Sequence, residues 1–182
     1  LLAKYCDSVL RKNSNILAED IDVVIDKIIS IFRFISDKDV FQRFYIRALS
    51  KRLIYKISAS DDAETRIISL MKEVEGIEFV QQMIRMIRDR DVSNSINEKF
   101  KEHLAIVKSP ILKNIDFNVS VLTNGSWPLQ KTENDPILVP DLQIIIDRFV
   151  AFYIRKNEGK KLNWFYGLST SELKTTYIVH KG

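Results

Sequence analysis

The sequence has a single cysteine, Cys6, among its 182 residues. One cysteine excludes an internal disulfide and is typical of proteins from a reducing compartment. It also leaves no plausible zinc set with the two distant histidines, His103 and His180, because structural zinc takes four clustered ligands. We therefore expect the chain to hold no metal or other cofactor of its own.

Glycine, proline and long apolar runs are also scarce. With only 5 glycines and 4 prolines, the chain should form long regular elements rather than a loop-rich fold. No apolar run approaches the roughly 20 residues that a membrane span needs, and no signal peptide is visible. Because the sequence starts without methionine and in the middle of a predicted helix, we expect a fragment of a longer protein.

The residues that are present suffice for a sizeable core. Hydrophobic residues make up 46% of the chain, including 10 phenylalanines and 6 tyrosines, which suits one large domain or two small ones. The net charge of +4 is mild and only weakly favours an acidic partner.

The first 109 residues show the three-and-four spacing of amphipathic helices. This spacing predicts helices over 1–12, 19–35, 37–53, 62–75 and 77–91, followed either by a separate helix over 95–107 or by one continuous helix to that point. Asp61, with Glu64 three residues later, predicts a capping box for the fourth of these helices. We therefore predict a helical bundle of the four-helix type over residues 1–109.

Three cations lie at four-residue spacing on the third predicted helix: Arg43, Arg47 and Lys51. Like charges placed in this way cost an exposed helix about 0.2–0.5 kcal/mol per pair. They form either a solvated face with local salt bridges or a basic groove for an acidic partner segment. The sequence alone leaves both interpretations open.

The period of the pattern changes after residue 110. Alternation with a two-residue period predicts strands over three stretches: 117–122, 162–166 and 172–179. Between them, a helix is predicted to begin at Pro140 and to end before Gly159. We therefore predict an α+β fold, mainly α, in which the bundle is followed by a small α/β domain with a few-stranded sheet over residues 110–182. So small a sheet would have edges that are ready to pair with another chain.

The sequence carries no pattern typical of an enzyme. It has no phosphate-binding loop, no Gly-x-Ser-x-Gly, and no cysteine or histidine with an orienting partner. Cys6 falls on an apolar helix face and is better explained as a core residue than as a nucleophile. The adjacent Asp61 and Asp62 are better explained as helix caps than as an acid/base pair.

A basic nucleic-acid-binding domain is the alternative function. The sequence pI is about 9.1, and Lys160 and Lys161 lie close to Trp164, Phe165 and Tyr166, a combination that suits a basic stacking surface. Against this, the net charge is modest and the aromatic residues alternate as they would in the core of a strand. A steep loss of affinity with salt would be the signature of such a domain.

Several segments together resemble one protein family, the cullins. The run DKDVF is followed by Phe44-Tyr45, by Lys51-Arg52-Leu53 and by Ser60-Asp61-Asp62, in the order and spacing found in that family. The segment VLTNGSWP resembles the cullin segment that contains a Gly-x-Trp-Pro core, and the run from Phe149 to Trp164 is also similar to cullins.

The resemblance implies a non-catalytic scaffold subunit of a multisubunit ubiquitin ligase. In cullins the matching region is a four-helix bundle followed by an α/β domain, and it holds a RING-box protein whose N-terminal strand joins the cullin sheet. Zinc is expected only in that RING partner, which recruits the ubiquitin-charged conjugating enzyme. The opening LLAKYCDSVL looks most similar to the cullin-1 branch, which works with Skp1-type adaptors in SCF complexes. The implied localisation is cytoplasmic and nuclear.

By position, the resemblance implies two groups of partner-binding residues. The expected cradle for the RING-box protein comprises residues of the predicted strands and a tryptophan: Phe117, Val119, Val121, Leu122, Trp127, Leu162, Trp164, Tyr166 and Tyr177. A basic groove for the acidic tail of the conjugating enzyme comprises Arg43, Arg47, Lys51, Lys160 and Lys161. As an alternative, Trp127 and Trp164 belong to the intramolecular core.

Other parts of the family are expected outside this sequence. They are the N-terminal repeats that bind the adaptor and substrate receptor, the terminal winged helix, and the lysine that accepts a ubiquitin-like modifier. No lysine of this chain is therefore assigned that role, the α/β domain is expected to continue beyond residue 182, and no membrane partner is expected.

Overall fold

The computed structural model describes residues 1–172, except for residues 15–16, 18–19, 108–114 and 131–135. The chain divides into two compact units. The first unit comprises Leu1–Lys108 with Asp116–Pro128, and the second comprises Ser109–Ile115 with Leu129–Gly182.

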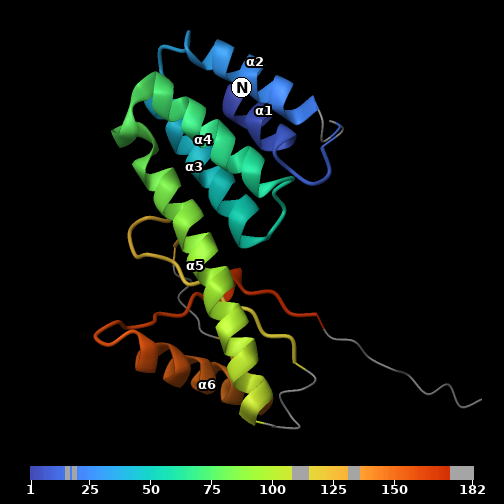
Figure 1. Cartoon of the computed structure of the whole chain (residues 1–182), viewed down its shortest axis with the longest axis vertical. Coiled ribbons are helices and arrows are strands. Elements are labelled where there is room, and N and C mark those ends of the chain that lie inside the picture. Colours follow the sequence, from blue (N-terminus) through green and yellow to red (C-terminus); the bar gives the residue numbers. More distant parts are fainter. Residues whose placement is uncertain (15–16, 18–19, 108–114, 131–135, 173–182) are drawn as a thin grey trace, which may run out of the picture. The chain divides into compact units, whose positions relative to one another are not determined.

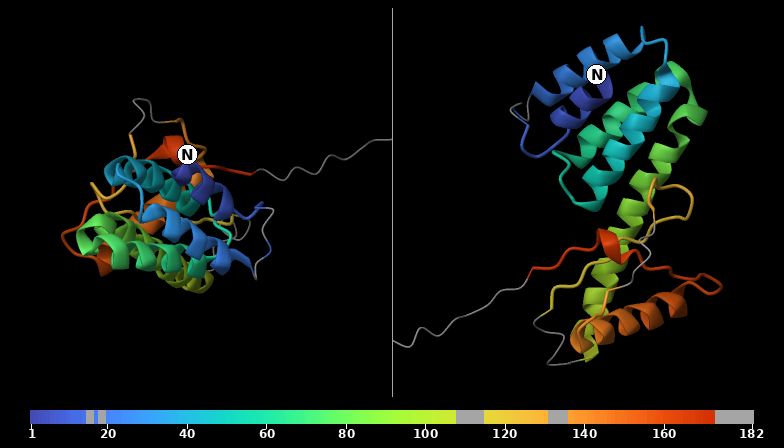
Figure 2. Two further views of the ribbon diagram at one scale, coloured as in Figure 1. Left: turned by 90° about the horizontal axis from the view of Figure 1, so that it is seen from above. Right: turned by 180° about the vertical axis from the view of Figure 1, so that it is seen from behind.

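The first unit is a bundle of helices (Figures 1 and 2). They are α1 (Leu2–Val9), α2 (Ile21–Phe32), α3 (Lys38–Ile54), α4 (Asp61–Glu75) and α5 (Ile77–Val107). Helix α1 packs on α3, α3 on α5, α5 on α4 and α4 on α2, while α2 also contacts α1. The predicted helices lie in the expected regions, and α5 is the continuous helix that was one of the two alternatives.

The core of the bundle is aromatic and aliphatic, as the three-and-four spacing predicts. The rings of Phe32, Phe41 and Tyr45 form a chain in which the centroids of Phe32 and Phe41 lie 4.9 Å apart and those of Phe41 and Tyr45 lie 5.7 Å apart. All three residues are buried. Helix α2 contains many β-branched residues, which are poor helix formers alone, so this packing is what stabilises it.

The predicted capping box at the start of α4 is wrong. Ser60 is the N-cap residue, and its hydroxyl accepts hydrogen bonds from the backbone N–H groups of Asp62 and Ala63. The Glu64 side chain does not reach back to the cap, because its carboxylate pairs with Arg52 inside the bundle.

The second unit contains α6 (Pro140–Lys156) and a short 3₁₀ helix, η3 (Tyr166–Leu168). Aromatic rings pack against one face of α6. The Phe149 ring lies 6.2 Å from Trp164 in an edge-to-face contact, and Trp164 stacks on Tyr166 with centroids 6.1 Å apart. Gly159, just beyond the end of α6, has a φ of 78°, which favours glycine at this position.

The predicted α+β fold class is wrong for the residues that the structure describes. Residues 117–122 and 162–166 form no strand, and the predicted strand over 172–179 lies, from residue 173 onwards, outside the described residues. In the described ranges the only β-bridge is an isolated one between Arg11 and Ser58. None of the described helices is both long and apolar enough to cross a membrane.

Candidate functional site

Three polar side chains on α5 fix the extended segment, residues 117–123, against the helix. Asp89, Ser93 and Asn97, which we call the polar row, lie four residues apart on one face of α5. The Asn97 amide makes two bonds with Val119: its Nδ2 donates to the carbonyl at 2.8 Å, and its Oδ1 accepts from the backbone N–H at 2.9 Å. Asn97 thereby pairs with Val119 as a neighbouring strand would.

The other two members of the polar row continue this pairing along the segment. Ser93 Oγ accepts from the backbone N–H of Val121 at 2.8 Å and lies 3.0 Å from its carbonyl oxygen. The Asp89 carboxylate accepts from the backbone N–H of Thr123 at 2.7 Å and from its hydroxyl at 2.8 Å. It also accepts from the indole N–H of Trp127 at 2.7 Å.

The four-residue spacing of the polar row on α5 matches the two-residue spacing of its partners on the extended segment for a simple geometric reason. Four residues of α-helix rise about 6.0 Å, and two residues of a strand rise about 6.6 Å. A polar residue at every fourth position of α5 can therefore meet every second residue of the extended segment. This accounts for the lack of a partner strand on this edge of the extended segment among the described residues, because helix side chains satisfy the backbone groups that such a strand would otherwise bind.

The opposite edge of the extended segment is open. Backbone groups alternate in direction along an extended chain, so the N–H and C=O groups of Asn118, Ser120 and Leu122 face away from the polar row. Within the part of the chain that the structure describes, these backbone groups make no hydrogen bond. Asn118 and Ser120 are exposed, and Leu122 is half-buried.

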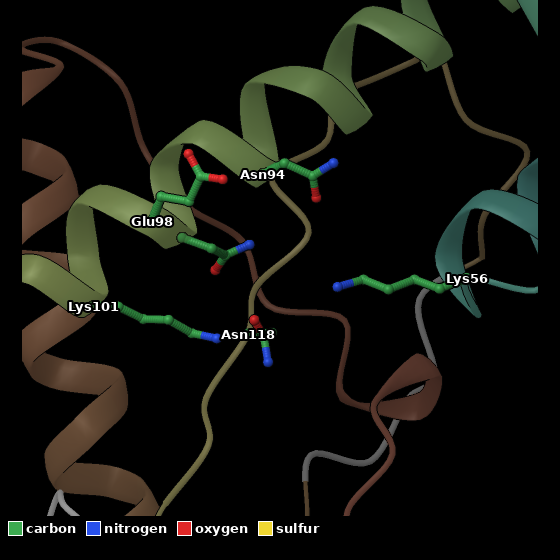
Figure 3. A pocket seen from close by; sticks show the side chains of 6 residues that line it. Lys56, Asn94, Glu98, Lys101 and Asn118 are labelled. Atoms are coloured by element: carbon green, nitrogen blue, oxygen red, sulfur yellow. The ribbon is translucent and has the colours of Figure 1, made fainter. Parts of the chain in front are cut away.

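A polar hollow of about 240 Å³ lies beside this segment (Figure 3). Its lining comes from the turn after α3, from α5 and from the extended segment: Lys56, Asn94, Asn97, Glu98, Lys101 and Asn118. Lys101 pairs with Asp116 at 3.2 Å, whereas Lys56 has no ion-pair partner among the described residues. The hollow therefore places a free cation beside the segment.

A buried ionic cluster joins α1, α3 and α4. The Arg52 guanidinium bonds to the Glu64 carboxylate at 2.6 and 3.0 Å and to Asp7 at 2.7 Å, and the side chains of Arg52 and Glu64 are both 0% exposed. Burial by itself disfavours the charged guanidinium, but its bonds to Glu64 and Asp7 outweigh this and raise the pKa of Arg52.

The remaining groups around this cluster suit a structural role. Burial raises the pKa of the Cys6 thiol to about 12, although the Arg52 charge acts in the opposite direction. Burial, together with the nearby Glu64 charge, also raises the pKa of Tyr45 well above its ordinary value. A thiol held neutral in the core is not a nucleophile, so the prediction of Cys6 as a core residue is confirmed.

The residues predicted for the RING-box cradle fall into separate groups. Phe117, Val119, Val121 and Leu122 lie in the extended segment and are half-buried. Trp127 is 8% exposed and donates to Asp89, so its side chain belongs to the first unit's own packing. In the second unit the described members are Leu162, Trp164 and Tyr166, all half-buried, and Tyr177 lies outside the described residues.

The residues predicted for the basic groove are exposed. Arg43, Arg47 and Lys51 line one side of α3 and make no ion pair within the described residues, although local salt bridges were one of the two interpretations. Lys160 and Lys161 are exposed in the second unit. The described residues contain no group of three or more His, Cys, Asp or Glu side chains that could hold a metal ion.

Sequence reasoning missed the structural role of the polar row. The signal was available, because the four-residue spacing of Asp89, Ser93 and Asn97 complements the two-residue spacing of Val119, Val121 and Thr123. Neither pattern is informative alone, since polar residues are common on the exposed side of a helix.

The comparisons with known proteins point to one family. A family model described as the cullin alpha solenoid domain matches residues 1–97, and one described as the cullin alpha+beta domain matches residues 121–181. A cullin-1 from Caenorhabditis elegans is 40% identical over 100% of this chain and 23% of its own length. A cullin-1 from Dictyostelium discoideum is 38% identical over 98% of the chain and 23% of its own length. A mouse cullin-4A is 37% identical over 97% of the chain and 23% of its own length.

Fold and sequence together therefore define the class of this protein. It is a cullin helical bundle with an extended segment that is hydrogen-bonded to its long helix. The chain belongs to the cullin family. Within that family it is similar to cullin-1 proteins of three organisms at 38–40% identity, which confirms the resemblance to the cullin-1 branch. The chain spans about a quarter of the length of these relatives.

Proposed function

We propose that the chain is part of a non-catalytic scaffold of a cullin-RING ubiquitin ligase, and that its extended segment receives the RING-box protein. The observation that carries this proposal is the open edge at Asn118, Ser120 and Leu122, opposite the polar row. A segment already held extended loses little further conformational freedom when a partner strand pairs with it.

The wider assignments rest on membership of the cullin family. Zinc is supplied by the RING partner, which brings the ubiquitin-charged conjugating enzyme, while adaptor and substrate receptor bind elsewhere in the full-length protein. The setting is cytoplasmic and nuclear. The alternative of a nucleic-acid-binding domain has no support from the relatives.

The exposed basic row on α3 supports a second contact within the same assembly. Arg43, Arg47 and Lys51 have no ion-pair partner among the described residues, so they are available to the acidic tail of a conjugating enzyme. Lys160 and Lys161, which are exposed on the second unit, are the other two cations proposed to meet acidic groups of the conjugating enzyme.

The test is co-expression of the chain with a RING-box protein, followed by gel filtration, for the wild type and for Ser120→Pro. Proline at this position removes one N–H of the open edge, and it favours an extended conformation at Val119, which Val119 already has. We expect co-elution to be lost while the far-ultraviolet circular dichroism of the bundle is unchanged.

The matched control is Ser120→Ala, which keeps the backbone N–H and should co-elute like the wild type. Val119→Pro is a poorer probe, because that N–H already bonds to Asn97. Co-elution of the proline variant at wild-type yield would reject the open edge as the site. In the wild-type complex, Arg47→Glu should weaken conjugating-enzyme binding at low salt, and unchanged affinity would reject the basic groove.

A further inference from the structure

A second surface hollow lies on the hairpin that α4 and α5 form around Gly76. It has a volume of about 280 Å³, and residues of both helices line it: Thr65, Ile68, Ser69, Lys72, Ile84, Ile87, Arg88 and Asp91. This volume lies just below the range typical of sites for small molecules and cofactors, about 300–1,000 Å³. It is large enough for one or two side chains of another protein. We call it the hairpin groove.

The floor of the hairpin groove is apolar. Ile68 is 3% exposed, while Ile84 and Ile87 are half-buried and lie three residues apart on α5. Both α5 residues follow the helical spacing of a buried face, yet each keeps part of its surface open to solvent. A floor of three isoleucines favours an aliphatic side chain, because contact would remove apolar area from water on both sides.

The rim of the groove carries uncompensated positive charge. Lys72 and Arg88 make no ion pair within the described residues. The one carboxylate in the lining, Asp91, is already paired with Arg90 at 2.8 Å. A partner that covers this floor therefore meets two cations and one neutralised anion. This favours a partner that carries acidic groups on either side of the aliphatic side chain that contacts the floor.

The spacing of the two cations indicates the shape of the partner. In a hairpin that turns at Gly76, Lys72 lies four residues before the turn and Arg88 twelve after it, so about eight residues of helix rise, or about 12 Å, separate them along the axis. The two helix axes add a lateral offset of about 8–10 Å, which the long side chains of lysine and arginine can span. Two carboxylates seven residues apart on one helix face are separated by about 10.5 Å, and a residue three positions after the first lies between them.

We propose that the hairpin groove docks a helix of a partner protein that has glutamate or aspartate at positions i and i+7 and leucine or isoleucine at i+3. The aliphatic side chain occupies the floor formed by Ile68, Ile84 and Ile87. The two carboxylates bind Lys72 and Arg88. This contact is separate from the extended segment and does not depend on the RING-box proposal.

The test uses two fluorescein-labelled peptides with strong helix formers at all other positions. One carries Glu, Leu and Glu at i, i+3 and i+7, and the other has the same composition in scrambled order. Fluorescence anisotropy with the whole chain at low salt should show saturable binding of the first peptide only. Amide chemical-shift changes should concentrate in α4 and the first half of α5.

Two variants and a matched control decide the outcome. Lys72→Glu combined with Arg88→Glu should weaken binding at least tenfold, and Ile84→Gln should do the same without changing the circular dichroism. Arg85→Glu removes an exposed cation from a position of α5 that does not line the groove and should have little effect. No saturable binding up to about 1 mM, equal binding of the scrambled peptide, or equal loss in Arg85→Glu would each overturn the proposal.

Discussion

Lys56 has a backbone conformation that lysine rarely adopts. Its φ is 54°, and it lies just after the last turn of α3. The backbone N–H of Ile57 bonds to the Arg52 carbonyl at 3.0 Å, and that of Lys56 reaches the Leu53 carbonyl at 3.4 Å. This is the Schellman pattern, in which glycine is the preferred residue at the left-handed position.

Lys56→Gly should therefore stabilise the fold. Removing the side chain relieves the left-handed strain at the cost of a more flexible unfolded chain, and we expect a net gain of about 0.5–1 kcal/mol. The urea midpoint at constant m value measures it. Lys56→Ala keeps the Cβ atom and should show no gain, so equal midpoints for the two variants would contradict a role for backbone strain at this position.

At the scale of elements, the buried ionic cluster between α1, α3 and α4 is the feature of the bundle whose disruption should cost the most free energy of folding. Arg52→Met would leave the Glu64 carboxylate buried without its cation, and only the Ser58 hydroxyl at 2.9 Å and the more distant Tyr45 hydroxyl would remain to bond it. Leaving one partner of a buried pair uncompensated costs about 3–5 kcal/mol.

Urea denaturation of Arg52→Met, Glu64→Leu and the double variant separates the ion pair from packing. The double variant should recover a large part of the loss, because no charge is then left buried alone. Arg66→Met is the control, since Arg66 is exposed and its pairs with Asp22 and Asp26 lie at the surface. A loss in Arg52→Met no larger than in this control would contradict the predicted role of the cluster.

The elements differ in how far the sequence predicts them. The helices of the bundle can be inferred from local spacing, because residues such as Ile25, Ile28 and Phe32 must share a buried face. The sheet was predicted from the alternation over 117–122, but alternation shows only that one side of a segment is apolar. The partner that bonds the edge of the segment lies far away in the sequence, as Asn97 does from Val119. No local sequence pattern specifies such a contact.

The candidate site was predictable only in part, because it also depends on contacts between residues that are far apart in the sequence. The residues of the extended segment were predicted as part of the site from the sequence, whereas the role of the polar row in positioning them was not. Glu64 shows a similar limit: its spacing from Asp61 fits a cap, but the buried Arg52 offers a stronger bond, and tertiary structure decides between the two.

At the scale of the whole molecule, stability should depend on pH through Asp7. Burial alone would raise the pKa of Asp7, but hydrogen bonds from Arg11 and Arg52 lower it below its ordinary value. A carboxyl whose pKa is lower in the folded state stabilises the fold above the unfolded pKa of about 3.9, and this contribution is lost as the pH falls through the folded value.

Thermal melts of the wild type and of Asp7→Asn between pH 7 and pH 2.5 measure this linkage. Asp7→Asn should have the lower Tm at pH 7, and the difference should shrink as the pH falls below about 4. A difference in Tm that stays constant over this range would mean that Asp7 contributes through packing and not through its charge.

The pairing of α5 with the extended segment also limits which length changes this part of the chain can accept. Each residue inserted into a helix rotates all later residues of that helix by about 100°. One residue added between Ser93 and Asn97 would turn the amide away from Val119, and one residue deleted from the extended segment would exchange its bonded edge for its open one. Viable insertions and deletions should therefore fall outside residues 89–97 and 119–123.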